Sequence, residues 1–253
     1  MKKIGNSLII AFAMYSKIPM PRADWEKENM RYVLCAFPLV GVVIGACIYG
    51  WNMMATMFSF GDGLSAAGYV LLPVLLTGGI HLDGFLDTCD ALHSYASTEK
   101  KLEILKDPHV GAFAVIGGCS LFAANFGLWS QVSEKGAQAL ALSFVMSRCL
   151  SGFSVVYLPC AKNSGLAATF QDGAHRKQVG VICMLELLLV FVVGCFWMPK
   201  NMILMTAAAG ITFFCYVRMA RRQFGGVTGD LAGFFLQMCE CLMAAFVVIG
   251  ECL

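Results

Sequence analysis

The sequence predicts an all-α fold, a polytopic membrane bundle of about seven transmembrane helices. Hydrophobic residues make up 58% of the 253-residue chain and charged residues only 13%, whereas a soluble domain carries roughly 25% charged residues. The mean hydropathy of +0.72 agrees with this reading. Several apolar stretches also reach the length of about 20 residues that crosses a bilayer as a helix. The net charge of +2 is too small to indicate a nucleic-acid-binding protein.

Seven apolar stretches are the expected spans. The sixth is short and the second runs directly into a row of acidic residues, so these two have the least defined boundaries. No internal repeat, low-complexity tract or linker divides the chain, and we expect a single membrane domain over residues 1–253. In chain order the stretches are 33–58, 64–82, 111–131, 137–159, 179–198, 202–217 and 231–252.

The N-terminal segment MKKIGNSLIIAFAMYSKIPMP begins with basic residues and has a short apolar core. These features are typical of a signal peptide, but no clear small-residue cleavage site follows. We therefore expect an uncleaved interfacial or re-entrant segment ahead of the first span.

The distribution of basic residues predicts the orientation of the protein in its membrane. Cytoplasmic loops carry an excess of lysine and arginine. With the N-terminus and the active site in the cytoplasm, fifteen of the 18 basic residues lie inside. Lys135 and Lys200 then lie outside, and Arg148 lies within a span. Inside are Lys2, Lys3, Lys17, Arg22, Lys27, Arg31, Lys100, Lys101, Lys106, Lys162, Arg176, Lys177, Arg218, Arg221 and Arg222.

Three aspartates stand where the second apolar stretch ends, in the segment GGIHLDGFLDTCDALH. Asp83, Asp87 and Asp90 are spaced by four and three residues, so a helix places them on one face. Carboxylates this close repel each other and lose hydration beside a bilayer. Mg²⁺ prefers such oxygen ligands and often shares them with substrate phosphates. We expect a magnesium site for phosphate chemistry; the alternative is a solvated acidic face stabilised by nearby lysines.

Two polar groups near this motif are further candidates. His81 can donate to a phosphate or act as a general acid–base, although a lone histidine is more often structural. In KLEILKDPHVGAF, Lys106 can bind phosphate and Asp107 a metal. The alternative is an ordinary charged turn beside the membrane. The catalytic candidates are thus Asp83, Asp87, Asp90, His81, Lys106 and Asp107.

Arg148 lies inside an apolar stretch, where arginines are costly and are usually paired or functional. Its partner can be a substrate diphosphate or an aspartate of the motif, and if the span is shifted the side chain reaches an interface instead. Glu240 lies within the last stretch. We expect its partner to be Arg148 or Lys162.

The segment RMARRQFGGVTGD (218–230) carries a third group. Arginines can hold phosphate through paired hydrogen bonds, although topology alone explains a basic triplet here. We expect the glycines to expose backbone N–H groups ahead of a helix N-terminus that attracts anions. Asp230 is either an N-cap or a metal ligand. The substrate-binding candidates are Arg148, Arg218, Arg222, Gly225, Gly226, Thr228 and Asp230.

Several segments, taken in order, resemble the cobalamin synthase family of adenosylcobinamide-GDP ribazoletransferases. They are MYSKIPMPR, FPLVGVVIG, HLDGFLDTCDAL, KLEILKDPHVGAF, SGLAATF and GGVTGD, and together they cover nearly the whole chain. Four positions depart from the family pattern. His109 stands where arginine is common, Ala91 replaces a glycine, Val227 replaces a glutamine, and Gln237 stands where an acid is frequent.

The resemblance implies the assembly of the nucleotide loop of the B12 cofactor. A hydroxyl of α-ribazole, or of its 5′-phosphate, attacks the cobinamide-side phosphate of adenosylcobinamide-GDP, and GMP leaves. Family members lie in the cytoplasmic membrane and require Mg²⁺. The partners expected are therefore these two substrates and the lipid bilayer, with no nucleic acid, and a homo-oligomer is left open. The competing hypothesis is a transporter that uses the acidic cluster to couple ions, but such sites lie near the midplane and often accompany inverted repeats.

Overall fold

The computed structural model describes residues 2–26, 28–161 and 166–253. Within these residues the regular structure is helical, apart from one isolated parallel bridge between Cys160 and Val227. Six helical segments are long and apolar enough to cross a membrane, and one bent helix pair can be counted as a seventh span. The prediction of a polytopic helical membrane protein is confirmed.

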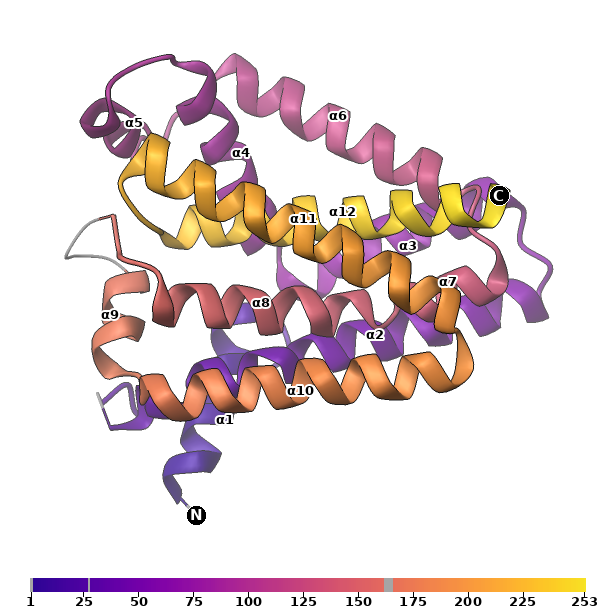
Figure 1. Cartoon of the computed structure of the whole chain (residues 1–253), viewed down its shortest axis with the longest axis horizontal. Helices are drawn as coiled ribbons and strands as arrows, with labels where there is room; N and C mark the ends of the chain where they lie inside the picture. Colours follow the sequence, from indigo (N-terminus) through magenta and orange to yellow (C-terminus); the bar gives the residue numbers. More distant parts are fainter. Residues whose placement is uncertain (1, 27, 162–165) are drawn as a thin grey trace.

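The six long segments run along the long axis of the molecule (Figure 1). The sixth predicted stretch, expected to end at residue 217, continues as a helix to Phe224, because the arginines in its last two turns are good helix formers that a hydropathy criterion ignores. The segments are η1 and α2 (Asn29–Tyr32 and Val33–Met57), α6 (Ala112–Trp129), α7 and α8 (Glu134–Leu140 and Ser143–Tyr157), α10 (Arg176–Trp197), α11 (Pro199–Phe224) and α12 (Gly229–Cys252).

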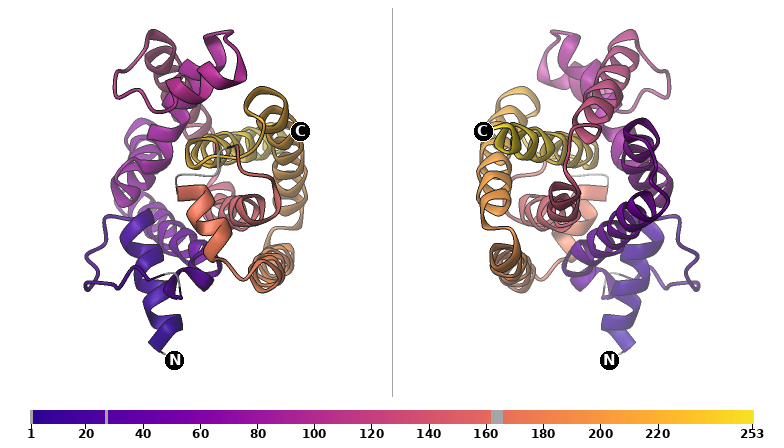
Figure 2. Two further views of the ribbon diagram at one scale, coloured as in Figure 1. Left: turned by 90° about the vertical axis from the view of Figure 1, so that its left-hand side faces the viewer. Right: turned by 90° about the vertical axis from the view of Figure 1, so that its right-hand side faces the viewer.

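Helix α8 forms the centre of the bundle, as the end-on views of Figure 2 show. In the α7–α8 segment, 83% of the most apolar stretch is buried, the highest share among the long segments. The backbones of α2 and the α7–α8 segment lie very close together. A Cβ at Gly41 would lie 2.3 Å from the carbonyl oxygen of Phe144, and a Cβ at Gly45 would lie 2.3 Å from that of Ala141. Glycines four residues apart are a common device for close helix packing in membranes.

Two glycines bend the second span. Helix α3 (Asp62–Thr77) ends at Gly78 and α4 (Ile80–His93) begins after Gly79, and the two helices meet at 96°. Both glycines have a left-handed backbone, with φ of 65° and 80°. This conformation costs other residues roughly 1–2 kcal/mol each. The two glycines therefore end α3 and turn the acidic helix α4 away from the direction of α3.

Short elements gather with α4 at one end of the bundle, on the left of Figure 1. They are α1 (Lys2–Tyr15), α5 (Thr98–Ile104) and α9 (Leu166–Gly173). The apolar part of α1 is shorter than a membrane span. The backbone N–H of Lys17 donates to the carbonyl of Leu76 at 2.7 Å and so joins the end of α1 to the end of α3.

Helix α10 presents a wide apolar surface to its surroundings. An exposed apolar patch of this kind marks an interface with protein or membrane on a soluble protein, and here it suits contact with lipid. The exposed residues are Leu185, Leu188, Leu189, Val192, Val193, Phe196 and Trp197.

Candidate active site

The aspartates of the predicted motif all lie on α4. Asp83 is exposed, and Asp87 and Asp90 are half-buried. The negative charge of Asp87 is opposed by Asp83, by Asp230 of α12 and by Asp90. The structure therefore confirms that the three acids share a helix and adds a fourth carboxylate from another helix.

Close contact between α4 and α12 brings the fourth carboxylate to the motif. A Cβ at Gly84 would lie 2.7 Å from Cα of Asp230, and a Cβ at Gly233 would lie 2.8 Å from the carbonyl oxygen of His81. Each helix thus offers a glycine where the other helix approaches, and any larger side chain would hold the two backbones apart. The N-cap of α12 is Thr228, whose hydroxyl accepts from the N–H of Leu231. Asp230 lies in the first turn and is not the cap.

The four acids lack a basic partner in the described part of the chain. Its ion pairs join Lys100 to Glu103, His109 to Asp107 and Arg148 to Glu240. Clustered carboxylates without a counter-charge suit a hard divalent cation with oxygen ligands. However, among the described residues no three acidic, histidine or cysteine side chains are already placed around a common point that could hold an ion. The magnesium site stays a prediction.

Asp90 has a structural role that the sequence did not reveal. Its Oδ2 accepts from the N–H of Gly111 at 2.7 Å, and its Oδ1 accepts from the N–H of Ala114 at 2.8 Å. These groups belong to the N-terminus of α6, where free N–H groups and the helix dipole favour a carboxylate. Asp90 therefore joins α4 to α6 and caps that helix.

A cavity of about 300 Å³ lies beside the acids. Its lining includes the titratable residues His81, Asp83 and Asp230, while the remaining residues are largely aromatic and aliphatic. Six helices contribute, including the short α1 and α9. The other lining residues are Tyr15, Leu34, Phe37, Ile80, Ser151, Val155, Phe170, Gly229, Ala232, Gly233 and Leu236.

His81 stands in the cavity wall among aromatic rings. It is only 5% exposed, and its Nε2 is buried without a hydrogen-bond partner. Its ring stacks on Tyr15 at a centroid distance of 5.9 Å and lies 5.7 Å from the ring of Phe37. Buried polar atoms are rarely left unpaired, so this nitrogen is a candidate ligand contact.

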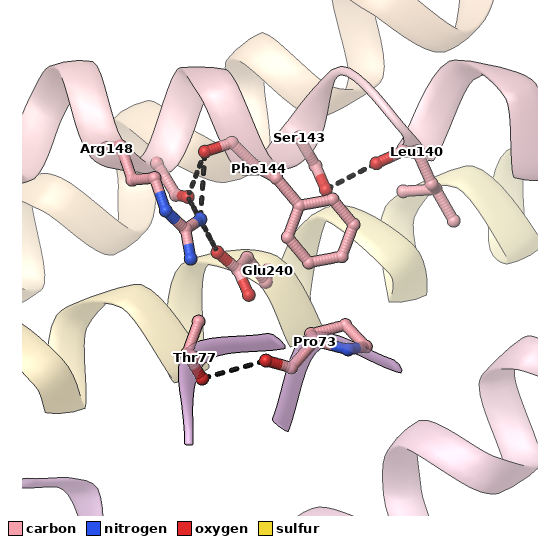
Figure 3. Close-up of polar contacts among 8 residues, drawn as sticks. Pro73, Thr77, Leu140, Ser143, Phe144, Arg148 and Glu240 are labelled. Atoms are coloured by element: carbon pink, nitrogen blue, oxygen red, sulfur yellow. Dashed lines mark hydrogen bonds and ion pairs between the residues drawn. The ribbon is translucent and has the colours of Figure 1, made fainter. Parts of the chain in front are cut away.

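Arg148 is paired within the bundle (Figure 3). Its Nη1 donates to Oε1 of Glu240 at 2.8 Å and to the carbonyl of Phe144 at 2.9 Å. Ser147 donates its hydroxyl to the same carboxylate oxygen at 2.8 Å. Of the partners considered for Arg148, the structure selects Glu240 and not an aspartate of the motif. The other partner considered for Glu240, Lys162, lies outside the described residues.

The loop between α11 and α12 is held by backbone hydrogen bonds to α11 and to the segment after α8. Gly225 ends α11 in a left-handed conformation with φ of 75°, a common helix stop. The N–H of Gly226 donates to Ala220, and the N–H of Val227 donates to Pro159. The N–H of Gly225 also donates to Ala220. The expectation that these glycines expose free N–H groups is therefore wrong at Gly225 and Gly226. The loop instead fixes the start of α12, which carries Asp230.

The remaining candidates lie on the surface at the same end. Arg218 and Arg222 are exposed on the last turns of α11, and Lys106 is exposed after α5. Asp107 is exposed and accepts from the backbone N–H and the ring of His109, and these hydrogen bonds lower the pKa of the Asp107 carboxyl. Neither Lys106 nor Asp107 lines the cavity.

Comparison with known proteins places the chain. The model of the family described as cobalamin-5-phosphate synthase matches residues 7–248. The chain belongs to the cobalamin-5-phosphate synthase family. It is 45% identical to a protein of Lachnoclostridium phytofermentans named adenosylcobinamide-GDP ribazoletransferase, over 97% of this chain and 94% of the relative.

Two further relatives with the same name come from Clostridium botulinum and Geobacillus thermodenitrificans. The Clostridium botulinum protein is 30% identical over 95% of this chain and 96% of its own length. The Geobacillus thermodenitrificans protein is 31% identical over 96% of this chain and 95% of its own length. No solved structure matches the chain.

Sequence reasoning missed the aromatic wall of the cavity. Tyr15, Phe37 and Phe170 come from α1, α2 and α9, and nothing about their local patterns marks them as neighbours. A signal was nevertheless present. Each of the three belongs to a segment that resembles this synthase family, namely MYSKIPMPR, FPLVGVVIG and SGLAATF. Ser164 and Gly165 of the last segment lie outside the described residues.

Proposed function

We propose that the protein is an adenosylcobinamide-GDP ribazoletransferase. A hydroxyl oxygen of α-ribazole, or of its 5′-phosphate, forms a bond to the cobinamide-side phosphorus of adenosylcobinamide-GDP. The bond from that phosphorus to the bridging oxygen breaks, GMP leaves with this oxygen, and the hydroxyl proton passes to a base. Adenosylcobalamin or its 5′-phosphate results. Membership of the family supports this proposal, and the observation that carries it is the group of four acids beside a cavity at one end of the bundle.

We propose Mg²⁺ as the resident cation. Asp83, Asp87 and Asp230 would hold it, because their carboxylates oppose one another and form no ion pair with a described residue. Asp90 stays a predicted ligand, since each of its oxygens accepts one backbone N–H and retains a second lone pair. A bound Mg²⁺ would neutralise charge on the diphosphate as it is transferred.

The side chains of the site have separable tasks. Asp83 and Asp230 line the cavity and can accept the hydroxyl proton, as can His81. Lys106, Arg218 and Arg222 are exposed at the same end and can attract the phosphates. Arg148 is buried against Glu240, so we propose that it positions α8 against α12 rather than binding substrate.

We also propose that this end of the molecule faces the cytoplasm. The C-terminal end of α11 lies at the same end of the bundle as α4 (Figure 1). This end of α11 carries Arg218, Arg221 and Arg222, and basic residues favour the cytoplasmic side. Both substrates would then reach the acids from the cytosol. A homo-oligomer stays a prediction. The transporter hypothesis loses its support, because the acids lie at one end of the bundle and the family is one of synthases.

The test uses purified protein in detergent or liposomes with adenosylcobinamide-GDP and α-ribazole 5′-phosphate. We expect GMP and the corrinoid product to form with Mg²⁺ and to stop on addition of EDTA, and excess Mg²⁺ should restore both. The absence of GMP from folded, substrate-bound protein would contradict the proposed activity. Formation of GMP that EDTA does not affect would contradict the metal assignment alone.

A further inference from the structure

The size of the cavity decides which substrate it can hold. Small-molecule sites commonly enclose about 300–1,000 Å³, and the cavity beside the acids, at about 300 Å³, is at the small end of this range. A corrin ring with its side chains is too large for it. On the proposed function, the smaller substrate is a benzimidazole riboside, which has a flat apolar base and a polar sugar.

The lining of the cavity combines the same two kinds of group. Asp83 and Asp230 are its acidic residues. Its aromatic residues lie close together: the ring of Tyr15 lies 4.2 Å from that of Phe37 and 6.3 Å from that of Phe170, measured between centroids. Aromatic rings bind flat heterocycles by stacking, independently of the hydrogen-bonding pattern of the base. An apolar base among these rings would direct its sugar hydroxyls to the acids.

His81 supplies the specific contact that stacking lacks. His81 is a lining residue of the cavity, and its Nε2 is buried without a hydrogen-bond partner. In a benzimidazole riboside one ring nitrogen carries the sugar and the other is a free acceptor. An Nε2–H group can donate to this acceptor, which would satisfy both atoms.

We propose that the cavity binds the base of the ribazole substrate, with His81 Nε2–H donating to the free ring nitrogen and the ribose directed to Asp83 and Asp230. This inference rests on the proposed function. It assigns the aromatic residues Tyr15, Phe37 and Phe170 to recognition of the base. The corrinoid substrate then approaches the acids from outside the cavity.

The test compares two nucleosides in two variants. α-Ribazole and an analogue with C–H in place of the free ring nitrogen are titrated into the purified protein, without the corrinoid substrate, by calorimetry. The wild type should bind α-ribazole about 3–10-fold more tightly than the analogue, the effect of one neutral hydrogen bond. His81→Phe should remove this preference. His93→Phe is the matched control, because His93 lies on the same helix but stacks on Phe113 and does not line the cavity.

A second variant tests the cavity without touching the histidine. Ser151 is buried in the cavity wall on α8, and Ser151→Leu should weaken binding of both nucleosides by tenfold or more. An undiminished preference in His81→Phe, or unchanged binding in Ser151→Leu, would overturn the inference. Selective binding without GMP release would support the cavity assignment and contradict the proposed function instead. The reverse result, GMP release with no difference between the nucleosides, would refute the base site alone.

Discussion

Substitution of Gly84 by alanine should separate the acids of α4 from Asp230. The added Cβ would stand 2.7 Å from Cα of Asp230 and 2.8 Å from its carbonyl oxygen, whereas ordinary contact begins at 3.4 Å, so the backbones must part by about 0.7 Å. Both atoms belong to the backbone and cannot rotate away. A displacement near 1 Å can cost about 100-fold in rate, while overpacking costs only about 1–3 kcal/mol in stability. We expect a folded protein with about 1% of the wild-type turnover.

The assay is release of GMP at saturating substrates, measured beside thermal unfolding in detergent. Gly50→Ala is the matched control, because Gly50 lies in α2 and a Cβ there would meet nothing within 4 Å. This variant should retain wild-type turnover. Turnover of Gly84→Ala within about twofold of the wild type, in protein that unfolds normally, would show that close α4–α12 contact does not set the geometry of the site.

Three further substitutions test the charged groups. Asp87→Ala should abolish GMP release and leave folding intact, and full activity of this variant would refute the metal assignment. The control is Asp62→Ala, at the exposed start of α3, which should change neither GMP release nor folding. Arg148→Met should lower the free energy of unfolding by about 3–5 kcal/mol, because the Glu240 carboxylate stays buried without its positive partner. In a double-mutant cycle measured by thermal unfolding, the additional substitution Glu240→Leu should recover part of this loss. Asp90→Ala should cost about 1 kcal/mol through loss of the α6 cap and retain more turnover than Asp87→Ala, and an unchanged melting temperature would contradict the capping role.

The sequence predicted the membrane spans well because each span is marked by its own stretch of neighbouring apolar residues. A bilayer sets the length of each apolar stretch, and the helical repeat alone places Asp83, Asp87 and Asp90 on one face. The bend between α3 and α4 was less accessible. Gly78 and Gly79 are evident in the sequence, but only the structure shows that both adopt positive φ.

The site itself depends on contacts between distant segments, which no local pattern reports. The capping of α6 by Asp90 joins residues 21 and 24 positions apart. The cavity draws on six helices. The pairing of Arg148 with Glu240 spans 92 positions, and it was foreseen only because a buried charge must find an opposite one.

The buried ion pair and the cavity are parts of one arrangement. The guanidinium of Arg148 lies 5.7 Å from the centre of the Phe37 ring, and Phe37 lines the cavity next to His81. The pair also joins α8 to α12, which carry Ser151 and Asp230 of the cavity wall. Lipid-exposed helices satisfy their own backbone hydrogen bonds through the bilayer core, and in this bundle the acids and the cavity lie at one end of the helices. The Arg148–Glu240 pair holds α8 and α12 together next to that end. The acids themselves lie on α4 and in the first turn of α12.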